Sequence, residues 1–149
     1  MTKARELGTY AGKILQTVQM ETDSLTSSNS TTYVNTSVTL SITPSSTSNK
    51  ILGVATTAVG TDSDIVALTR VYNSTSTTVV SDVNRYTPRS SALIVNHGSH
   101  TFVDSPSSTS AQTYVVQIAS DRSAVSYFNS RGGGSIASHS SIVLMEVAG

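Results

Sequence analysis

Hydrophobic and polar residues alternate strictly along residues 34–42. The apolar or β-branched positions are Val34, Thr36, Val38, Leu40 and Ile42. A period of two is typical of a β-strand with one buried face and one solvated face. Pro44 ends the alternation, a Ser/Thr loop follows, and a second apolar run begins at residue 50. The pattern therefore predicts a strand, a surface loop and another strand.

The same unit recurs along the whole chain. Residues 50–59 are apolar at positions of both parities, which favours a central strand. Residues 21–32 predict a polar loop, and residues 97–100 predict a hairpin tip. Short strands at this spacing are typical of an all-β fold, an antiparallel β-sandwich or jelly roll. Strands are expected at residues 12–20, 34–42, 50–59, 65–72, 78–83, 92–96, 101–103, 112–119, 124–129 and 140–147.

A five-residue sequence, Pro-Ser-Ser-Thr-Ser, occurs at residues 44–48 and again at residues 106–110. In both places a predicted strand precedes it and another follows. Proline ends a strand because it has no N–H, and the hydroxyl groups that follow can satisfy unpaired backbone groups. The repetition predicts two similar loops at the ends of two strands.

Residues 1–11 differ from the rest, because only they carry a helical pattern, with Thr2 as a cap and Gly8 as a stop. Two helical turns are not stable alone, so we expect a helical or extended anchor that docks on another surface. Residues 12–149 then form the sandwich domain. The residues expected to share the docking face of the anchor are Ala4, Leu7 and Ala11.

Composition supports a folded domain with a neutral, hydroxyl-rich surface. The 149 residues suffice for one domain with a real core. The chain has 28 Ser and 22 Thr, and only 12% of its residues are charged, against roughly 25% in typical domains. The formal net charge is zero. Nucleic acids and anionic membranes attract clustered Lys and Arg, so neither is expected as a partner.

Cysteine is absent, which excludes disulfides, thiolate zinc sites and cysteine nucleophiles. The first 20 residues have no apolar core of the signal-peptide type, and no run of 18 apolar residues occurs. We therefore expect synthesis in a cytoplasm without a signal peptide, and no insertion into a membrane.

Two groups of side chains could be considered as metal ligands. His97 and His100 lie near Asp104, but a hairpin tip would leave both imidazoles solvated. Asp62 and Asp64 could contribute to a calcium site, but the remaining positions of an EF-hand loop are missing. We expect no metal site, although calcium binding by the loops stays open.

No pattern identifies an active site. There is no Gly-x-Ser-x-Gly turn to single out a serine nucleophile. The glycine-rich sequence at residues 131–135 lacks the Lys-Ser/Thr of a phosphate loop. We predict a protein that is not an enzyme and needs no cofactor, with a small hydrolase as a remaining alternative. The side chains best suited to contact a sugar are Tyr86, Arg89, His97 and His100.

Four segments, in order along nearly the whole chain, resemble short β-rich virion proteins of tailed bacteriophages, of the tail-fibre or fibre-tip type. They are GKILQ at residues 12–16, SITPSSTSNKIL at 41–52, DSPSSTSAQTYVVQ at 104–117 and SIVLMEV at 141–147. A fifth segment, KAREL at residues 3–7, is similar to a sequence found near fibre and adaptor domains of such phages.

The resemblance implies a non-enzymatic structural protein of the virion, made in the host cytoplasm. It implies a homotrimer that contacts other virion proteins of the tail or capsid, with host surface glycans as a further partner. The chain lacks the long repetitive shaft of a complete fibre. The alternatives are therefore a capsid decoration protein and a stand-alone carbohydrate-binding module.

Overall fold

The computed structural model describes residues 12–61, 65–87, 94–131 and 138–149, which form eleven β-strands and no helix that could cross a membrane. The expected anchor with Ala4, Leu7 and Ala11, the pair Asp62 and Asp64, and Arg89 lie outside the described residues. The strands are β1 (Ile14–Thr22), β2 (Thr26–Ser28), β3 (Val34–Ile42), β4 (Lys50–Thr61), β5 (Ala67–Asn73), β6 (Thr78–Val79), β7 (Asn84–Tyr86), β8 (Val95–Asp104), β9 (Gln112–Ser120), β10 (Ser126–Phe128) and β11 (Ser140–Val147).

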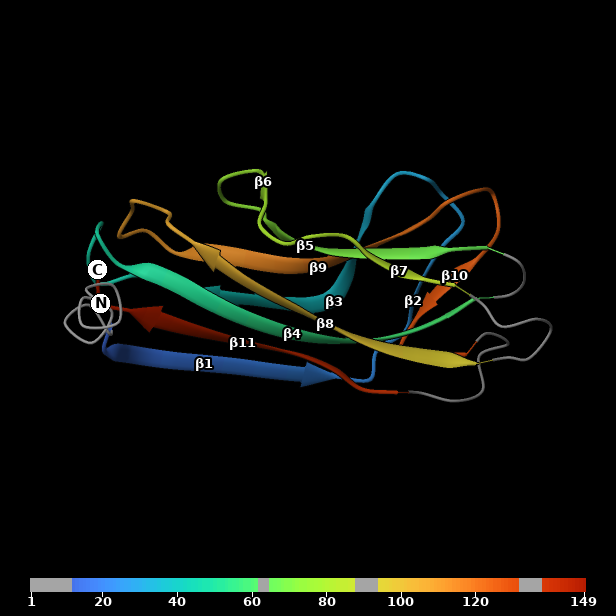
Figure 1. Ribbon diagram of the computed structural model, residues 1–149, viewed down its shortest axis with the longest axis horizontal. Coiled ribbons are helices and arrows are strands. Elements are labelled where there is room, and N and C mark those ends of the chain that lie inside the picture. Colours follow the sequence, from blue (N-terminus) through green and yellow to red (C-terminus); the bar gives the residue numbers. More distant parts are fainter. Residues whose placement is uncertain (1–11, 62–64, 88–93, 132–137) are drawn as a thin grey trace, which may run out of the picture.

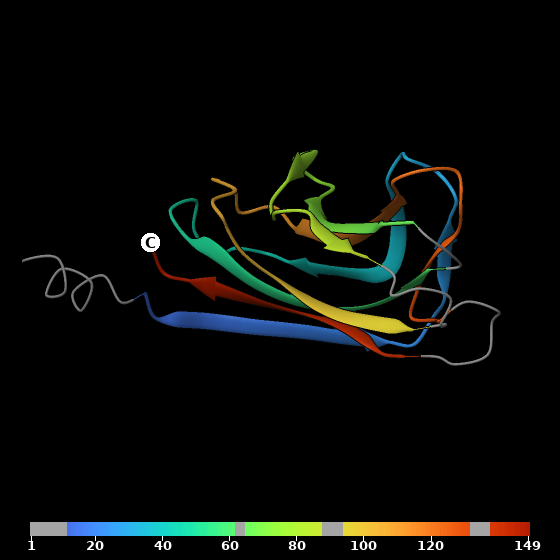
Figure 2. The same ribbon diagram turned by 45° about the vertical axis from the view of Figure 1, so that its right-hand side comes forward.

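The strands form two antiparallel sheets that pack face to face (Figures 1 and 2). Sheet A has the order β1-β11-β4-β10-β2 with β8 on β4, and sheet B has the order β3-β9-β5-β6 with β7 on β5. Four strand pairs are nested along the chain: the first strand pairs with the last, and each later pair lies inside the previous one in the sequence. These pairs are β1·β11, β3·β9, β4·β8 and β5·β7. A long hairpin rolled up in this way is a jelly roll, so the predicted fold class is confirmed.

The core lies between the sheets and is built by the alternating positions. In β3, Val38 and Ile42 point inward and are at most 2% exposed, as the period of two predicts. They pack in one cluster with residues of sheet A such as Ile142 and Leu144, both 0% exposed. Burying each such side chain contributes roughly 1.5–3 kcal/mol. The core thus joins residues that are about 100 positions apart in the chain.

The hairpin predicted at residues 97–100 is wrong, because β8 runs without a break from residue 95 to residue 104. Ten consecutive residues of β8 pair with β4, from Val95 opposite Gly60 to Asp104 opposite Ile51. This long ladder outweighs the local turn preference of Gly98-Ser99. His100 is therefore buried rather than solvated, whereas His97 is exposed as expected.

Three further segments differ from the prediction. The expected strand at 78–83 is only the two-residue β6, and the expected break at 84–88 contains β7. The polar loop at 21–32 contains β2, which pairs with β10. These short strands exist because a partner strand lies beside them, and the sequence pattern does not show the partner.

The two Pro-Ser-Ser-Thr-Ser loops lie at the same end of the sandwich, near the C-terminus (Figure 1). In the first loop the Ser48 N–H donates to Ser46 Oγ at 3.3 Å, and in the second the Ser110 N–H donates to Ser108 Oγ at 3.0 Å. Equivalent serines thus make the same hydroxyl turn. The prediction of two similar loops is confirmed at these positions.

Candidate functional site

A polar cleft of about 360 Å³ lies between β7 and β8, where the edges of the two sheets meet. We call it the β7–β8 cleft. Two of the residues predicted to bind a ligand, Tyr86 and His97, line it together. His97 is exposed at its rim. The other lining residues are Asn84, Arg85, Thr87, Asn96, Gly98 and Ser99.

His100 lies in the wall beside this cleft and is 3% exposed. Its Nε2 is 2.9 Å from Thr69 Oγ1 and 3.3 Å from Asn84 Nδ2, and its Nδ1 is 3.2 Å from Ser81 Oγ. Burial lowers the pKa of His100 below its ordinary value, and the Asp82 carbonyl opposes this in part. The neutral imidazole therefore acts as a connector between β5, β8 and the segment before β7.

Tyr86 also belongs to the wall, because its side chain is 6% exposed and its ring lies over Gly98. Its hydroxyl is 2.5 Å from Thr57 Oγ1 and accepts a hydrogen bond from Thr69 Oγ1 at 3.3 Å. Stacking on a sugar requires an exposed ring face, so neither Tyr86 nor His100 is placed to stack. Of the predicted ligand-binding residues that the structure describes, only His97 faces the solvent.

The arrangement does not build a hydrolase. Ser81 lies near His100, but its hydroxyl donates to the Asp82 carbonyl and accepts from the Val71 N–H. The opposite side of the imidazole meets a threonine and an amide rather than a carboxylate. A serine nucleophile needs a histidine that is oriented by an acid. This cluster therefore lacks the relay of a catalytic triad.

The possible metal ligands are not brought together either. Asp104 lies at the far end of β8, where its Oδ2 accepts hydrogen bonds from Tyr114 Oη and from Asn73 Nδ2, both at 2.9 Å. Burial raises the pKa of the Tyr114 hydroxyl, and the nearby Asp104 carboxylate adds to this. Among the residues with a described position, no three His, Asp or Glu side chains gather as a metal site would require.

The outer face of sheet A carries an apolar surface that sequence reasoning missed. The register places Val103 opposite Leu52, Leu52 opposite Met145, and Val54 opposite Val143. Val103 is 60% exposed and the other four are half-buried. We call these five residues the apolar stripe. It crosses β8, β4 and β11, and the next row toward the other end holds Ser99, Thr56 and Ser141.

The outer face of sheet B carries a polar and aromatic group that was also missed. The Arg70 guanidinium carbon lies 3.8 Å from the centre of the Tyr33 ring and 5.7 Å from that of Tyr72. Arg70 Nε donates to Gln117 Oε1 at 2.8 Å, and Gln117 Nε2 donates to Asn35 Oδ1 at 2.9 Å. We call these five residues the Arg70 cluster.

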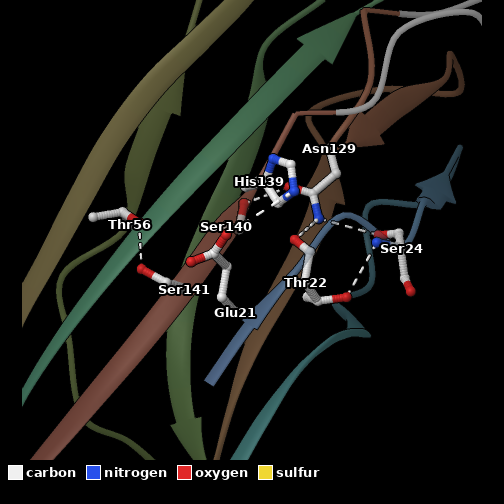
Figure 3. A network of polar contacts seen from close by, with 8 residues as sticks. All are labelled: Glu21, Thr22, Ser24, Thr56, Asn129, His139, Ser140 and Ser141. Carbon is white, nitrogen blue, oxygen red and sulfur yellow. Dashed lines mark hydrogen bonds and ion pairs between the residues drawn. The ribbon is translucent and has the colours of Figure 1, made fainter. Parts of the chain in front are cut away.

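A buried junction of polar contacts fixes the end of the sandwich where β1 and β11 meet β10 (Figure 3). Asn129 is fully buried and has a left-handed backbone with φ of 60°. Its side chain donates to the carbonyls of Thr22 and Ser24 and accepts from Ser140 Oγ. Nearby, His139 and Glu21 form an exposed ion pair at 4.0 Å. Every contact of Asn129 is within the fold, so this network is structural.

Comparisons with known proteins add only distant likenesses. No family model matches the chain, and no curated protein matches it. VP2 of the infectious bursal disease virus subviral particle is 10% identical with a TM-score of 0.43, over 91% of this chain and 40% of that chain. A protein of the disulfide-linked pili of Bacillus endospore appendages is 10% identical with a TM-score of 0.40, over 93% of both chains.

The C-terminal CBM6 of a marine laminarinase from Zobellia galactanivorans is also similar. It is 13% identical with a TM-score of 0.36, over 87% of this chain and 99% of that chain. The chain spans only 40% of the length of the viral protein. Likenesses this distant carry no argument about function, which has to come from the surfaces of this molecule.

Proposed function

We propose that the protein is a structural component of a bacteriophage virion, of the tail-fibre or fibre-tip type, that acts by assembly rather than by chemistry. The apolar stripe is the observation that carries the proposal. Contiguous exposed apolar side chains on a β-sheet face mark protein–protein contacts. On the outer face of sheet A, Val103 is 60% exposed and the other four residues of the stripe are half-buried.

The partner that we propose for the stripe is a second copy of this chain in a homotrimer. A closed ring of three needs two different surfaces on each copy that fit one another. The start of β1 offers the second surface, because Ile14 is 52% exposed and Leu15 is 43% exposed. The zero net charge means that copies do not repel one another over long distances.

Native mass spectrometry at micromolar concentration tests the assembly directly. We expect the wild-type protein to be trimeric. Val103→Lys places a charge within the proposed contact and should weaken association by about tenfold or more, because a desolvated unpaired charge costs at least 1.4 kcal/mol. Val103 is on a solvent-facing position of an edge strand, so this substitution leaves the core unchanged.

Thr39→Lys is the matched control. Thr39 is an exposed strand residue on the outer face of sheet B, opposite Val115. The control adds the same charge to the other face and should leave the trimer intact. A wild-type protein that is monomeric at micromolar concentration, or a Val103→Lys protein that remains fully trimeric, would overturn the proposal.

A further inference from the structure

The Arg70 cluster holds a half-buried guanidinium group in a fixed position on the outer face of sheet B. Its plane stacks on Tyr33 at 3.8 Å, and its Nε is occupied by Gln117. Gln117 is only 7% exposed and is itself held by Asn35. Arginine normally pays a cost in side-chain freedom when it binds a partner. In this cluster the sheet has already restricted that freedom.

The terminal Nη groups of Arg70 are left for an external partner. Within the described residues the guanidinium makes no ion pair, and its single hydrogen bond uses Nε. The two terminal Nη groups form a fork that the hydrogen bond from Nε to Gln117 leaves unused. A guanidinium held in this way fits a carboxylate, which it binds through two parallel N–H···O bonds.

A second arginine lies on the same face. Arg85 on β7 pairs with Leu68 on β5, two residues from Arg70, so their side chains leave the sheet on the same side. Arg85 is exposed, and both arginines act electrostatically on the Tyr33 hydroxyl. Arg85 also acts electrostatically on Asp121, but this carboxylate accepts a hydrogen bond from the Val66 N–H and pairs with Arg122. The centre of the face is therefore positively charged on a neutral chain.

The surroundings of the two arginines favour a saccharide over other anionic ligands. The half-buried Tyr72 offers an aromatic surface beside the guanidinium, with its ring centre 5.7 Å from the guanidinium carbon. Sugar rings pack their C–H faces on such aromatic groups. The exposed hydroxyl and amide side chains of Thr39 and Asn35 on the same face supply further hydrogen-bonding groups.

We propose that the outer face of sheet B binds a carboxylate-bearing saccharide, with the Arg70 fork on the carboxylate, Arg85 as a second cation and Tyr72 against the sugar ring. This site is separate from the apolar stripe, and it shares only Arg85 with the lining of the β7–β8 cleft, so it adds a ligand-binding activity to the proposed assembly function. Gln117 is a positioning residue, since it acts through Arg70.

Isothermal titration calorimetry with three probes tests the ligand class. Trigalacturonic acid should bind in a saturable way, and raising the salt concentration should weaken it because the contact is between charges. Maltotriose, which has no carboxylate, should bind at least tenfold more weakly. A triglutamate peptide should also bind at least tenfold more weakly. Equal binding of maltotriose or of the peptide would overturn the proposal, and so would no binding of trigalacturonic acid at millimolar concentration.

Substitutions separate the fork from the charge. Arg70→Lys keeps the charge but loses the two-pronged geometry, and should weaken trigalacturonic acid binding about tenfold. Gln117→Leu should weaken it less, because Arg70 remains but is no longer held. Arg122→Lys is the control, because it is the same substitution at an arginine outside the cluster, whose side chain is 64% exposed. If Arg70→Lys bound as tightly as the wild type while Arg122→Lys did not, the assignment would be wrong.

The two proposals fail independently. Arg70→Lys should leave the oligomeric state unchanged, and Val103→Lys should leave trigalacturonic acid binding unchanged, because the residues lie on opposite outer faces. Circular dichroism and the melting temperature of each variant show whether it is folded. A folded Arg70→Lys protein with unchanged affinity would overturn the saccharide site whatever the oligomeric state.

Discussion

At the scale of single residues, Glu146 is a buried carboxylate held by four hydrogen bonds. It lies on the inner face of β11 and is 1% exposed. Oε1 accepts hydrogen bonds from Asn49 Nδ2 and the Ser45 N–H at 2.6 Å and from Ser45 Oγ at 2.8 Å. Oε2 accepts one from Gln16 Nε2 at 2.6 Å. These four neutral donors replace the water molecules that the carboxylate loses on burial, and no cation takes part. Glu146 thereby connects the first Pro-Ser-Ser-Thr-Ser loop to β1 and β11.

The same contacts predict how stability depends on pH. Burial alone would raise the pKa of Glu146, but the hydrogen bonds from Asn49, Gln16 and Ser45 lower it from 4.5 to about 2. A folded-state pKa below the unfolded value contributes stability that is complete above pH 4.5 and is lost as the pH falls toward 2. We expect the melting temperature to fall through this window. Glu146→Gln should remove this dependence.

Glu146→Gln should also destabilise the protein at neutral pH, by about 2–3 kcal/mol. An amide in this place points a donor at groups that are donors themselves, and a buried mismatch costs more than a missing hydrogen bond. Urea unfolding at pH 7 measures the loss. Glu21→Gln is the control, because the Glu21 side chain is 68% exposed and its loss should have little effect. Equal stabilities of the two variants would contradict the structural role of Glu146.

At the scale of elements, the pairing of β4 with β8 depends on a glycine. Gly53 lies opposite Phe102, and a Cβ atom at Gly53 would come within 2.1 Å of the Phe102 ring. The ring fills this space and also lies 5.4 Å from the Tyr114 ring. A strand usually loses stability from an interior glycine, but here the missing side chain makes room for the aromatic core.

Gly53→Ala should therefore destabilise the protein by about 1–3 kcal/mol, although alanine is normally the better residue in a strand. Thermal or urea unfolding gives the value. In the double variant Gly53→Ala/Phe102→Leu the smaller side chain leaves room for the methyl group. The double variant should therefore lose less unfolding free energy than the two single variants lose together. Fully additive losses would show that the ring is not what the new methyl group meets.

The same elements show how far the sequence predicts this fold. The alternation in β3 correctly placed Val38 and Ile42 in the core, and local turn signals correctly ended most strands. The hairpin at 97–100 was wrong because the partner of β8 is β4, about 40 residues earlier in the chain. Local patterns report which side of a strand is buried but not which strand lies beside it.

The candidate sites could not be predicted for the same reason. Arg70, Gln117 and Asn35 belong to three strands, β5, β9 and β3, and meet only through the register of sheet B. The apolar stripe likewise needs the registers of β8, β4 and β11. The prediction did find the region of the β7–β8 cleft through Tyr86 and His97, but it placed Tyr86 on the surface instead of in the wall.

At the scale of the whole molecule, the jelly roll leaves two outer faces and one open edge for contacts. The side where β3 meets β1 and β11 is closed by contacts between the sheets. The other side carries the β7–β8 cleft. The outer face of sheet A carries the apolar stripe, and that of sheet B carries the Arg70 cluster with Arg85. Assembly and ligand binding can therefore use different faces of one rigid body.

The domain boundary that the sequence predicts at residue 12 gives the last prediction. The Ala148 N–H donates to the Lys13 carbonyl at 3.0 Å, and β1 pairs with β11 from Ile14 to Thr22. The first sheet contacts of the described chain thus begin after residue 12. Removing residues 1–11 should leave the melting temperature within a few degrees of the wild type, because the described residues 12–149 already form a closely packed core between the two sheets.

If residues 1–11 are the anchor that the sequence predicts, their deletion should separate folding from attachment. The shortened protein should still bind trigalacturonic acid but should no longer join virus particles in a co-sedimentation assay. Ala4→Glu together with Leu7→Glu is the matched variant, because it keeps the length and charges the expected docking face. A large fall in melting temperature on deletion would instead place the segment in the core. Unchanged attachment would move the contact with the particle onto the sandwich itself, where the apolar stripe is the face able to supply it.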